Sequence, residues 1–145
     1  MTVYEIWRWV PNYEGAYEVS NTGRVRSVDR TIHCYNWRAK KKMDMHVKGR
    51  LLRPGKGSHG YFTVSLGRHN TKTVHSLVAD AFLGPKPENC EVLHNDGSRD
   101  NNHVSNLRYG TRSENNLDAV KHGTRDLAKL RLASQKGLAL RWGKK

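Results

Sequence analysis

Residues 90–123 decide the fold of this chain, and they read CEVLHNDGSRDNNHVSNLRYGTRSENNLDAVKHG. A short strand-like run ends in His94, and Asn95-Asp96-Gly97 directly after it is a turn signal. A polar loop leads to a second short run at residues 104–109, which Gly110 ends. The segment therefore predicts two short strands joined by a polar loop.

A helix is predicted directly after the second strand. The stretch Thr111-Arg112-Ser113-Glu114 matches a capping box, in which the threonine hydroxyl and the glutamate carboxylate bind free backbone amides at a helix start. The helix should run to about His122, where Gly123 is a natural C-terminal cap.

We expect three polar side chains to meet around a small cleft in this strand, loop, strand, helix arrangement. His94 leaves the first strand, Asn106 lies on the returning strand, and Asn115 lies in the first turn of the helix. The cleft would contain a titratable base, amide groups that orient the base or ligate a metal, and the positive end of a helix dipole, which favours a phosphate. Metal-assisted hydrolysis of a phosphodiester needs these parts. An ordinary loop has the same composition, so the residues alone leave both interpretations open.

The middle of the chain supplies the expected core. Residues 61–66 alternate as a strand does, with Phe62, Val64 and Leu66 facing inward. The apolar spacing then changes to that of a helix over residues 74–82, which Gly84-Pro85 stops. His75 lies at the edge of the helical stripe, and we expect it to be a packed or hydrogen-bonded residue rather than a catalytic one.

The first fifty residues are expected to form small β structure with a basic loop. Two alternating runs over residues 17–27 flank an Asn-Thr-Gly turn, and Arg24 and Arg26 share one face of the second run. Two guanidinium groups side by side suit phosphates, although a solvated charged face explains them equally well. Residues 29–50 are less regular, and Lys40-Lys41-Lys42 within them predicts a mobile basic loop that helps DNA binding without specifying it.

The composition indicates a polyanionic partner. The 145 residues include 26 Lys and Arg against 13 Asp and Glu, a net charge of +13. The charge divides into +5, +1 and +7 over residues 1–50, 51–100 and 101–145, so it lies in the flanks. Nucleic acid is favoured over a membrane surface, because no basic amphipathic anchor opens the chain.

Other classes of protein are disfavoured by the same composition. No apolar run approaches 18 residues, so no membrane span is expected, and the amino terminus does not resemble a secretory signal. Cys34 and Cys90 are isolated, and we expect neither a disulfide framework nor a structural zinc.

Two sets of motifs resemble a known family. The first set is Val74-His75-Ser76-Leu77-Val78-Ala79-Asp80-Ala81-Phe82, His94-x-Asp96-Gly97, Asn101-Asn102, Asn106-Leu107 and Thr111-x-x-x-Asn115. The second set is Trp7, Tyr13-Glu14-Gly15, Tyr17-Glu18-Val19-Ser20-Asn21 and Gly23-Arg24-Val25-Arg26-Ser27. The first set resembles the HNH nucleases of phage and intron homing endonucleases, and the second resembles the nuclease-associated modular motif that commonly precedes them.

The resemblance covers roughly residues 5–123 and implies an α+β fold, with a small amino-terminal β-hairpin module (1–50) and a ββα-metal nuclease domain (51–123). The resemblance does not reach residues 124–145, whose composition favours a basic, helical tail, although a partly disordered tail explains it equally well. It implies that His94 is the general base, that Asn106 holds its imidazole, and that Asn115 ligates one divalent cation, Mg²⁺ in most members with Mn²⁺ as a substitute. The expected products carry 5′-phosphate and 3′-hydroxyl ends. The expected DNA contacts come from Arg24, Arg26, Lys40, Lys41, Lys42 and Arg108.

One position departs from the family pattern. Many members place Asp or Asn, the second protein ligand of the metal, where this chain has Leu93. Leucine does not bind a hard cation, which requires oxygen. Three outcomes are open. Phosphate and water complete the coordination shell of the metal with Asn115, or Asp96 or another carboxylate replaces the missing ligand. In the third, the nuclease is weak or inactive. We favour a working site with reduced protein ligation.

The sequence thus predicts a metal-dependent DNA endonuclease of the homing or nicking HNH type. The alternative is a catalytically weak or inactive DNA-binding relative that acts in regulation or recombination. An RNA-binding protein would explain the charge but leave His94, Asn106 and Asn115 unused. We expect double-stranded DNA as the partner, no small-molecule substrate, a monomer or weak dimer, and a phage-encoded protein in the cytoplasm of a bacterial host.

Overall fold

The computed structural model describes residues 4–124, and its amino-terminal part is an antiparallel sheet in the strand order β1-β2-β3-β6. The strands are β1 (Trp7–Trp9), β2 (Tyr17–Ser20), β3 (Val25–Ser27) and β6 (Arg50–Leu51). The predicted turn is confirmed, because β2 pairs with β3 and Gly23 between them has a φ of 93°. A Cβ on Gly23 would lie 2.8 Å from Cβ of Asn102, so this glycine also lets the loop of Asn102 pack against the turn.

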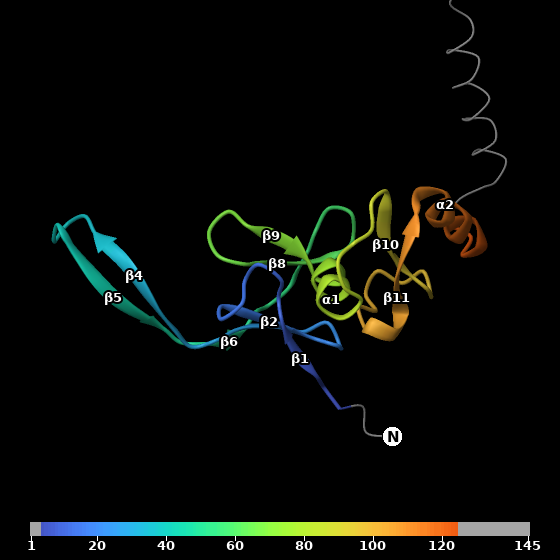
Figure 1. Cartoon of the computed structure of the whole chain (residues 1–145). Helices are drawn as coiled ribbons and strands as arrows, with labels where there is room; N and C mark the ends of the chain where they lie inside the picture. The colour runs from blue at the N-terminus through green and yellow to red at the C-terminus, as the bar shows by residue number, and fades with distance from the viewer. Residues whose placement is uncertain (1–3, 125–145) are drawn as a thin grey trace, which may run out of the picture.

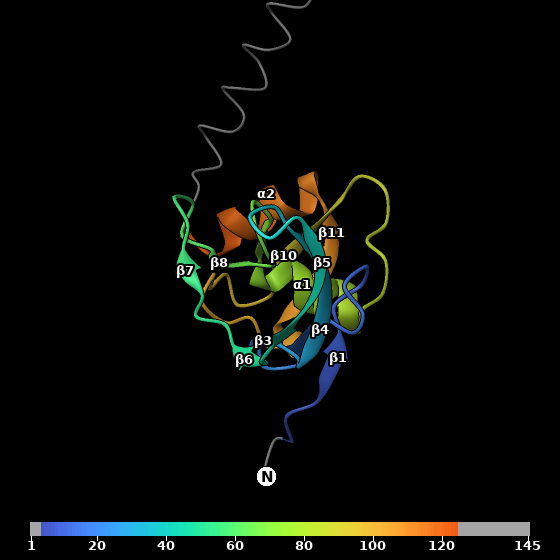
Figure 2. The same cartoon turned by 90° about the vertical axis from the view of Figure 1, so that its left-hand side faces the viewer.

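The prediction of a mobile basic loop over residues 29–50 is wrong, because most of this segment is a regular β-hairpin. β4 (Arg30–Asn36) and β5 (Lys41–Val47) pair along their full length, from Arg30 opposite Val47 to Asn36 opposite Lys41. The hairpin projects from the body as an arm (Figure 1), and it points toward the viewer in the turned view (Figure 2). Its strands bury no apolar face, which is why hydrophobic patterning does not reveal them.

The second sheet leads into the central helix. Its strands β7 (Gly55–Lys56), β8 (Phe62–Ser65) and β9 (Thr71–Thr73) are antiparallel, and α1 (Val74–Phe82) follows β9 without a break. The predicted inward residues are confirmed, since Val64 and Leu66 are buried and Phe62 packs against the core. The predicted helix is confirmed at both ends.

The carboxy-terminal part has the predicted strand, loop, strand, helix order. β10 (Cys90–His94) pairs with β11 (Leu107–Thr111), and α2 (Arg112–Lys121) follows. The capping box is confirmed: the Thr111 hydroxyl accepts from the Glu114 amide at 3.3 Å, and the Glu114 carboxylate accepts from the Thr111 amide at 2.7 Å. The second strand starts later and ends later than expected, because residues 104–106 form a 3₁₀ turn and pairing continues through Gly110.

One hydrophobic core joins the amino-terminal sheet to the nuclease part. Val10, Val19 and Val25 are fully buried from the first sheet, and they meet Val74 and Val78 of α1. The α+β class is confirmed, whereas the division at residues 50 and 123 stays a prediction. The expected helical tail lies outside the described residues from residue 125 onward. Within residues 4–124, no helix combines the length and apolar character that a membrane crossing requires.

Candidate active site

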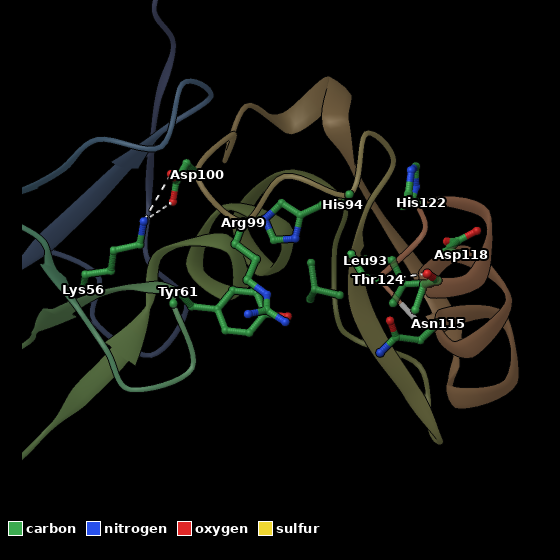
Figure 3. A pocket seen from close by; sticks show the side chains of 14 residues that line it. Lys56, Tyr61, Leu93, His94, Arg99, Asp100, Asn115, Asp118, His122 and Thr124 are labelled. Atoms are coloured by element: carbon green, nitrogen blue, oxygen red, sulfur yellow. Dashed lines mark hydrogen bonds and ion pairs between the residues drawn. The ribbon is translucent and has the colours of Figure 1, made fainter. Parts of the chain in front are cut away.

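A cavity of about 450 Å³ opens between the loop before β8, strand β10 and helix α2. Figure 3 shows His94 at its rim, Tyr61 and Arg99 on one side, and Leu93 and Asn115 on the other. The ends of β10 and the start of α2 therefore present side chains to one opening. Two of the three residues that the sequence predicted to meet, His94 and Asn115, line it.

His94 is held by Asn102, which comes from the loop between β10 and β11. The imidazole Nε2 lies 3.3 Å from Asn102 Oδ1, and both side chains are buried. The amide nitrogen of Asn102 faces the carbonyl oxygen of Asp100 at 3.4 Å, which sets the amide orientation. Because Oδ1 accepts, Nε2 carries the imidazole proton, and Nδ1 keeps the lone pair that a general base needs.

The surroundings of His94 favour the neutral imidazole. Burial lowers its pKa below the ordinary value of 6.5, and the charge of Arg99 lowers the pKa further. The hydrogen bond that His94 donates to Asn102 and the charge of Asp96 oppose this effect without reversing it. The ring is consequently unprotonated at neutral pH and able to accept a proton.

Two further rings pack against His94. The His75 ring centroid is 5.2 Å from that of His94, and the Tyr61 ring centroid is 5.9 Å away in a stacked arrangement. Burial, followed by the charge of His94, lowers the pKa of His75 to about 4. His75 is thus a packed residue, as predicted, and its Nδ1 has no hydrogen-bond partner within the described residues. No sequence pattern predicts that Tyr61 joins this group.

Asn106 does not touch the imidazole, in contrast to its expected role. Its amide nitrogen donates to Asp96 Oδ1 and to the Asn101 carbonyl, both at 2.9 Å, and its Oδ1 accepts from the Asp96 amide at 3.1 Å. The reason is its place at the end of the 3₁₀ turn, which directs it into the loop. Asn106 therefore braces the loop, and the contact with His94 belongs to Asn102.

Asp96, an expected metal ligand, is part of the same brace. Its carboxylate accepts from the Ser98 amide and from Asn101 Nδ2, both at 2.8 Å, in addition to Asn106. The hydrogen bond from Asn101, followed by that from Asn106, holds the pKa of Asp96 below its usual value. Its oxygens are already engaged by three donors.

Asn115 contacts a carboxylate that the sequence did not point to. Its Nδ2 donates to Glu91 Oε2 at 2.6 Å, so the first turn of α2 is tied to β10. Leu93, two residues after Glu91, is buried, and it supplies no oxygen at the position where many family members have their second metal ligand. Among the described residues, no three His, Cys, Asp or Glu side chains are grouped so as to hold a metal ion. Oxygen donors next to the cavity therefore come from Asn115 and single carboxylates.

The predicted DNA-contacting arginines have carboxylate partners. Arg108 pairs with Asp118 at 2.5 Å and with Glu114 at 3.7 Å, so its charge faces helix α2. Arg24 and Arg26 share one face, as predicted, and both guanidinium groups lie over the ring of Trp7. Each is also paired, Arg24 with Glu5 and Arg26 with Glu18.

Other cations are better placed to meet an anion. Lys40, Lys41 and Lys42 lie exposed at the tip of the β4–β5 arm, close to Trp37, whose side chain is 83% exposed. Arg99, which the sequence did not single out, lines the cavity, stacks over Tyr61 and donates to the His59 carbonyl at 2.8 Å. Within residues 4–124, Arg99 has no carboxylate partner.

Comparison with known proteins places this geometry in a family. The NUMOD4 motif matches residues 5–67, and the HNH endonuclease family matches residues 72–117. The chain is 34% identical over 108 residues to the DNA endonuclease I-HmuI of Bacillus phage SP01, covering 72% of this chain and 52% of that protein. It is 33% identical over 96 residues to the uncharacterized HNH endonuclease L245 of Acanthamoeba polyphaga mimivirus, covering 64% of this chain and 23% of that protein.

A solved structure agrees with these sequence matches. The solved structure titled "DNA binding and cleavage by the HNH homing endonuclease I-HmuI" superposes on this chain with a TM-score of 0.61 at 30% identity. The match covers 90% of this chain and 66% of that chain. The chain spans about half the length of the curated I-HmuI sequence. It belongs to the HNH homing endonuclease family, with a NUMOD4 motif ahead of its HNH domain.

Proposed function

We propose that this chain is a divalent-metal-dependent DNA endonuclease that leaves 5′-phosphate and 3′-hydroxyl ends. The observation that carries the proposal is the hydrogen bond between His94 Nε2 and Asn102 Oδ1, which leaves Nδ1 as a free base beside the cavity. In the proposed reaction, Nδ1 takes a proton from the water whose oxygen bonds to the phosphorus atom, while the bond from phosphorus to the 3′ oxygen breaks and that oxygen takes a proton from solvent. His75 and Tyr61 pack on the ring and keep it oriented during the transfer.

The cavity also offers positive charge for a phosphate. Arg99 lies beside His94 without a carboxylate partner in the described chain, and its stacking on Tyr61 fixes the guanidinium plane. We assign it to a non-bridging oxygen of the scissile phosphate, which it would contact through two N–H groups.

The residues present fit the family's divalent cation with fewer protein ligands than other members supply. Asn115 would hold it through its amide oxygen, and Mg²⁺ commonly keeps several waters beside one or two protein ligands. When bound, the cation supplies positive charge against the phosphate and the departing 3′ oxygen. Asp96 is not needed for this, because its oxygens hold the loop.

The β4–β5 arm is assigned to DNA binding. Its tip combines Lys40, Lys41 and Lys42 with the exposed Trp37 ring, and basic side chains beside an aromatic ring suit phosphates and bases. I-HmuI binds and cleaves DNA and comes from a bacteriophage, which supports the same partner here and action within a bacterial host. A monomer or weak dimer is the expected state.

The second candidate is a DNA-binding relative that has lost catalysis. The buried Leu93 favours it, because the family's second metal ligand is absent there. The two candidates are separated by incubating supercoiled plasmid with the full chain and Mg²⁺, Mn²⁺ or EDTA, followed by end-group analysis. Nicking that needs a metal and leaves 5′-phosphate ends supports the endonuclease. Duplex binding without nicking in either metal supports the second candidate.

A further inference from the structure

The carboxylate of Glu91 stands out among those in the segments that build the site, because it contacts Asn115, which lines the cavity. Four others already have partners that hold them in place: Asp96 with three donors of its own loop, Asp100 with Lys56, Asp118 with Arg108, and Glu114 with the cap residue Thr111. Glu91 accepts from Asn115 Nδ2 at 2.6 Å and has no cationic partner within residues 4–124. Among the described residues, the hydrogen bond from Asn115 is the one contact that holds its carboxylate.

The position of Glu91 on β10 matches that of the missing ligand. Successive side chains of a strand alternate between its faces, so Glu91 and Leu93 share a face, and His94 lies on the other. The glutamate side chain is one methylene longer than that of an aspartate, so its carboxylate extends farther from β10. The hydrogen bond to Asn115 shows that its oxygens reach the start of α2.

The opposite strand leaves this side chain unopposed. Glu91 pairs with Gly110, which has no side chain, whereas Leu93 pairs with Arg108. A Cβ on Gly110 would lie 2.5 Å from Leu93 Cδ1, 2.7 Å from Arg108 Nη1 and 3.1 Å from Glu114 Oε2, so these side chains fill the space over Gly110. On this face of β10, Glu91 is the residue next to Leu93 that carries an oxygen donor.

We propose that Glu91 is a carboxylate ligand of the divalent cation and replaces the oxygen that Leu93 does not supply, an assignment that rests on the proposed function. Rotation of the Asn115 amide by half a turn presents its oxygen beside the Glu91 carboxylate, which gives two adjacent oxygen donors for a hard cation. Waters and a phosphate oxygen complete the shell.

The test is a Mn²⁺ titration of the ¹⁵N-labelled full chain, followed through paramagnetic broadening of its amide signals without DNA. Broadening should centre on Glu91 and Asn115. Glu91→Gln keeps an oxygen that accepts the hydrogen bond from Asn115, so the fold is retained. This variant should need a Mn²⁺ concentration at least about tenfold higher than the wild type does for the same broadening. Glu88→Gln removes the same charge from an exposed position three residues earlier and should titrate as the wild type does.

Unchanged broadening in Glu91→Gln overturns the assignment, as does the absence of broadening near Asn115 in the wild type. The result is separable from the proposed function. If the wild type nicks DNA while Glu91→Gln binds Mn²⁺ as the wild type does, the endonuclease function is supported and Glu91 is not a metal ligand. If Glu91→Gln loses Mn²⁺ binding while the wild type does not cleave DNA, Glu91 is a metal ligand and the endonuclease function is rejected.

Discussion

His94 Nε2 lies 3.3 Å from Asn102 Oδ1, and the Asn102 amide nitrogen faces the Asp100 carbonyl. This relationship fixes the imidazole tautomer from the loop that joins β10 to β11. Gly23 of the amino-terminal sheet contributes to it, because a side chain there would collide with Asn102. The NUMOD4 part thus supports the position of a residue that contacts the proposed base.

Asn102→Asp should move the pH dependence of cleavage upward. A carboxylate beside the imidazole stabilises its protonated form, so the pKa of His94 rises. The acidic limb of the rate profile, where the rate rises as the general base loses its proton, should then shift to higher pH by about one unit or more. Single-turnover rates on a labelled duplex between pH 5 and 9 measure the shift. Asn89→Asp, an exposed control, should leave the profile unchanged. A uniform loss of rate without a shift would mean that Asn102 only supports the fold.

His75 should make the protein less stable at acid pH. Its pKa of about 4 in the folded state lies below the ordinary 6.5, so the unfolded chain binds a proton first as the pH falls. The free energy of unfolding should therefore be highest above pH 6.5 and fall by about 1.4 kcal/mol per pH unit from this group down to pH 4. His94, whose pKa is also lowered, acts in the same direction.

Denaturant unfolding at several pH values measures this slope. His75→Asn should reduce it between pH 4 and 6.5, whatever the absolute stability of the variant. His69→Asn, at an exposed turn position with a φ of 60°, serves as the matched control. Equal slopes in the wild type and in His75→Asn would contradict the link between burial and protonation.

The lysines of the arm and Arg108 should differ in their effect on DNA binding. Each Lys40, Lys41 or Lys42 that contacts a phosphate releases counterions, so its change to Gln should reduce the salt slope of duplex binding by about one. Arg108→Gln should leave the slope unchanged and lower thermal stability instead, because its guanidinium group is held by Asp118 and Glu114. Fluorescence anisotropy over a range of salt concentrations gives the slopes. A reduced slope for Arg108→Gln alone would reverse these assignments.

The capping box should control the position of Asn115. Thr111→Ala removes the side-chain acceptor for the Glu114 amide and should cost about 1 kcal/mol of stability. Thr111→Ser retains the hydroxyl and should behave as the wild type does, and Ser113→Ala at an exposed helical position should be close to neutral. Thermal unfolding with amide exchange of the α2 first turn provides the measurement. A loss in Thr111→Ala no larger than in Ser113→Ala would exclude a structural role for the cap.

The predictions that succeeded rest on local signals. The order of strands and helix around His94 and Asn115 follows from turn residues, an apolar period and a capping box, each encoded within a few neighbouring positions. The same holds for Gly23 between β2 and β3. These features do not depend on distant parts of the chain.

The features that sequence reasoning missed depend on contacts between distant segments. Asn101, Asn102 and Asn106 are chemically alike, and only the path of the loop decides which one meets the imidazole. Tyr61 joins His94 across more than thirty positions of sequence. The β4–β5 arm buries no apolar face, so its polar strands resemble a loop in the sequence.

The most direct test of the account is the single-turnover cleavage rate of His94→Ala on a duplex in Mg²⁺, compared with the wild type and His69→Asn. We expect His94→Ala to lose cleavage by about a hundredfold or more while retaining duplex affinity, and added imidazole to restore part of the rate. His69→Asn should cleave as the wild type does. Cleavage by His94→Ala at the wild-type rate would contradict the assignment of His94 as the general base.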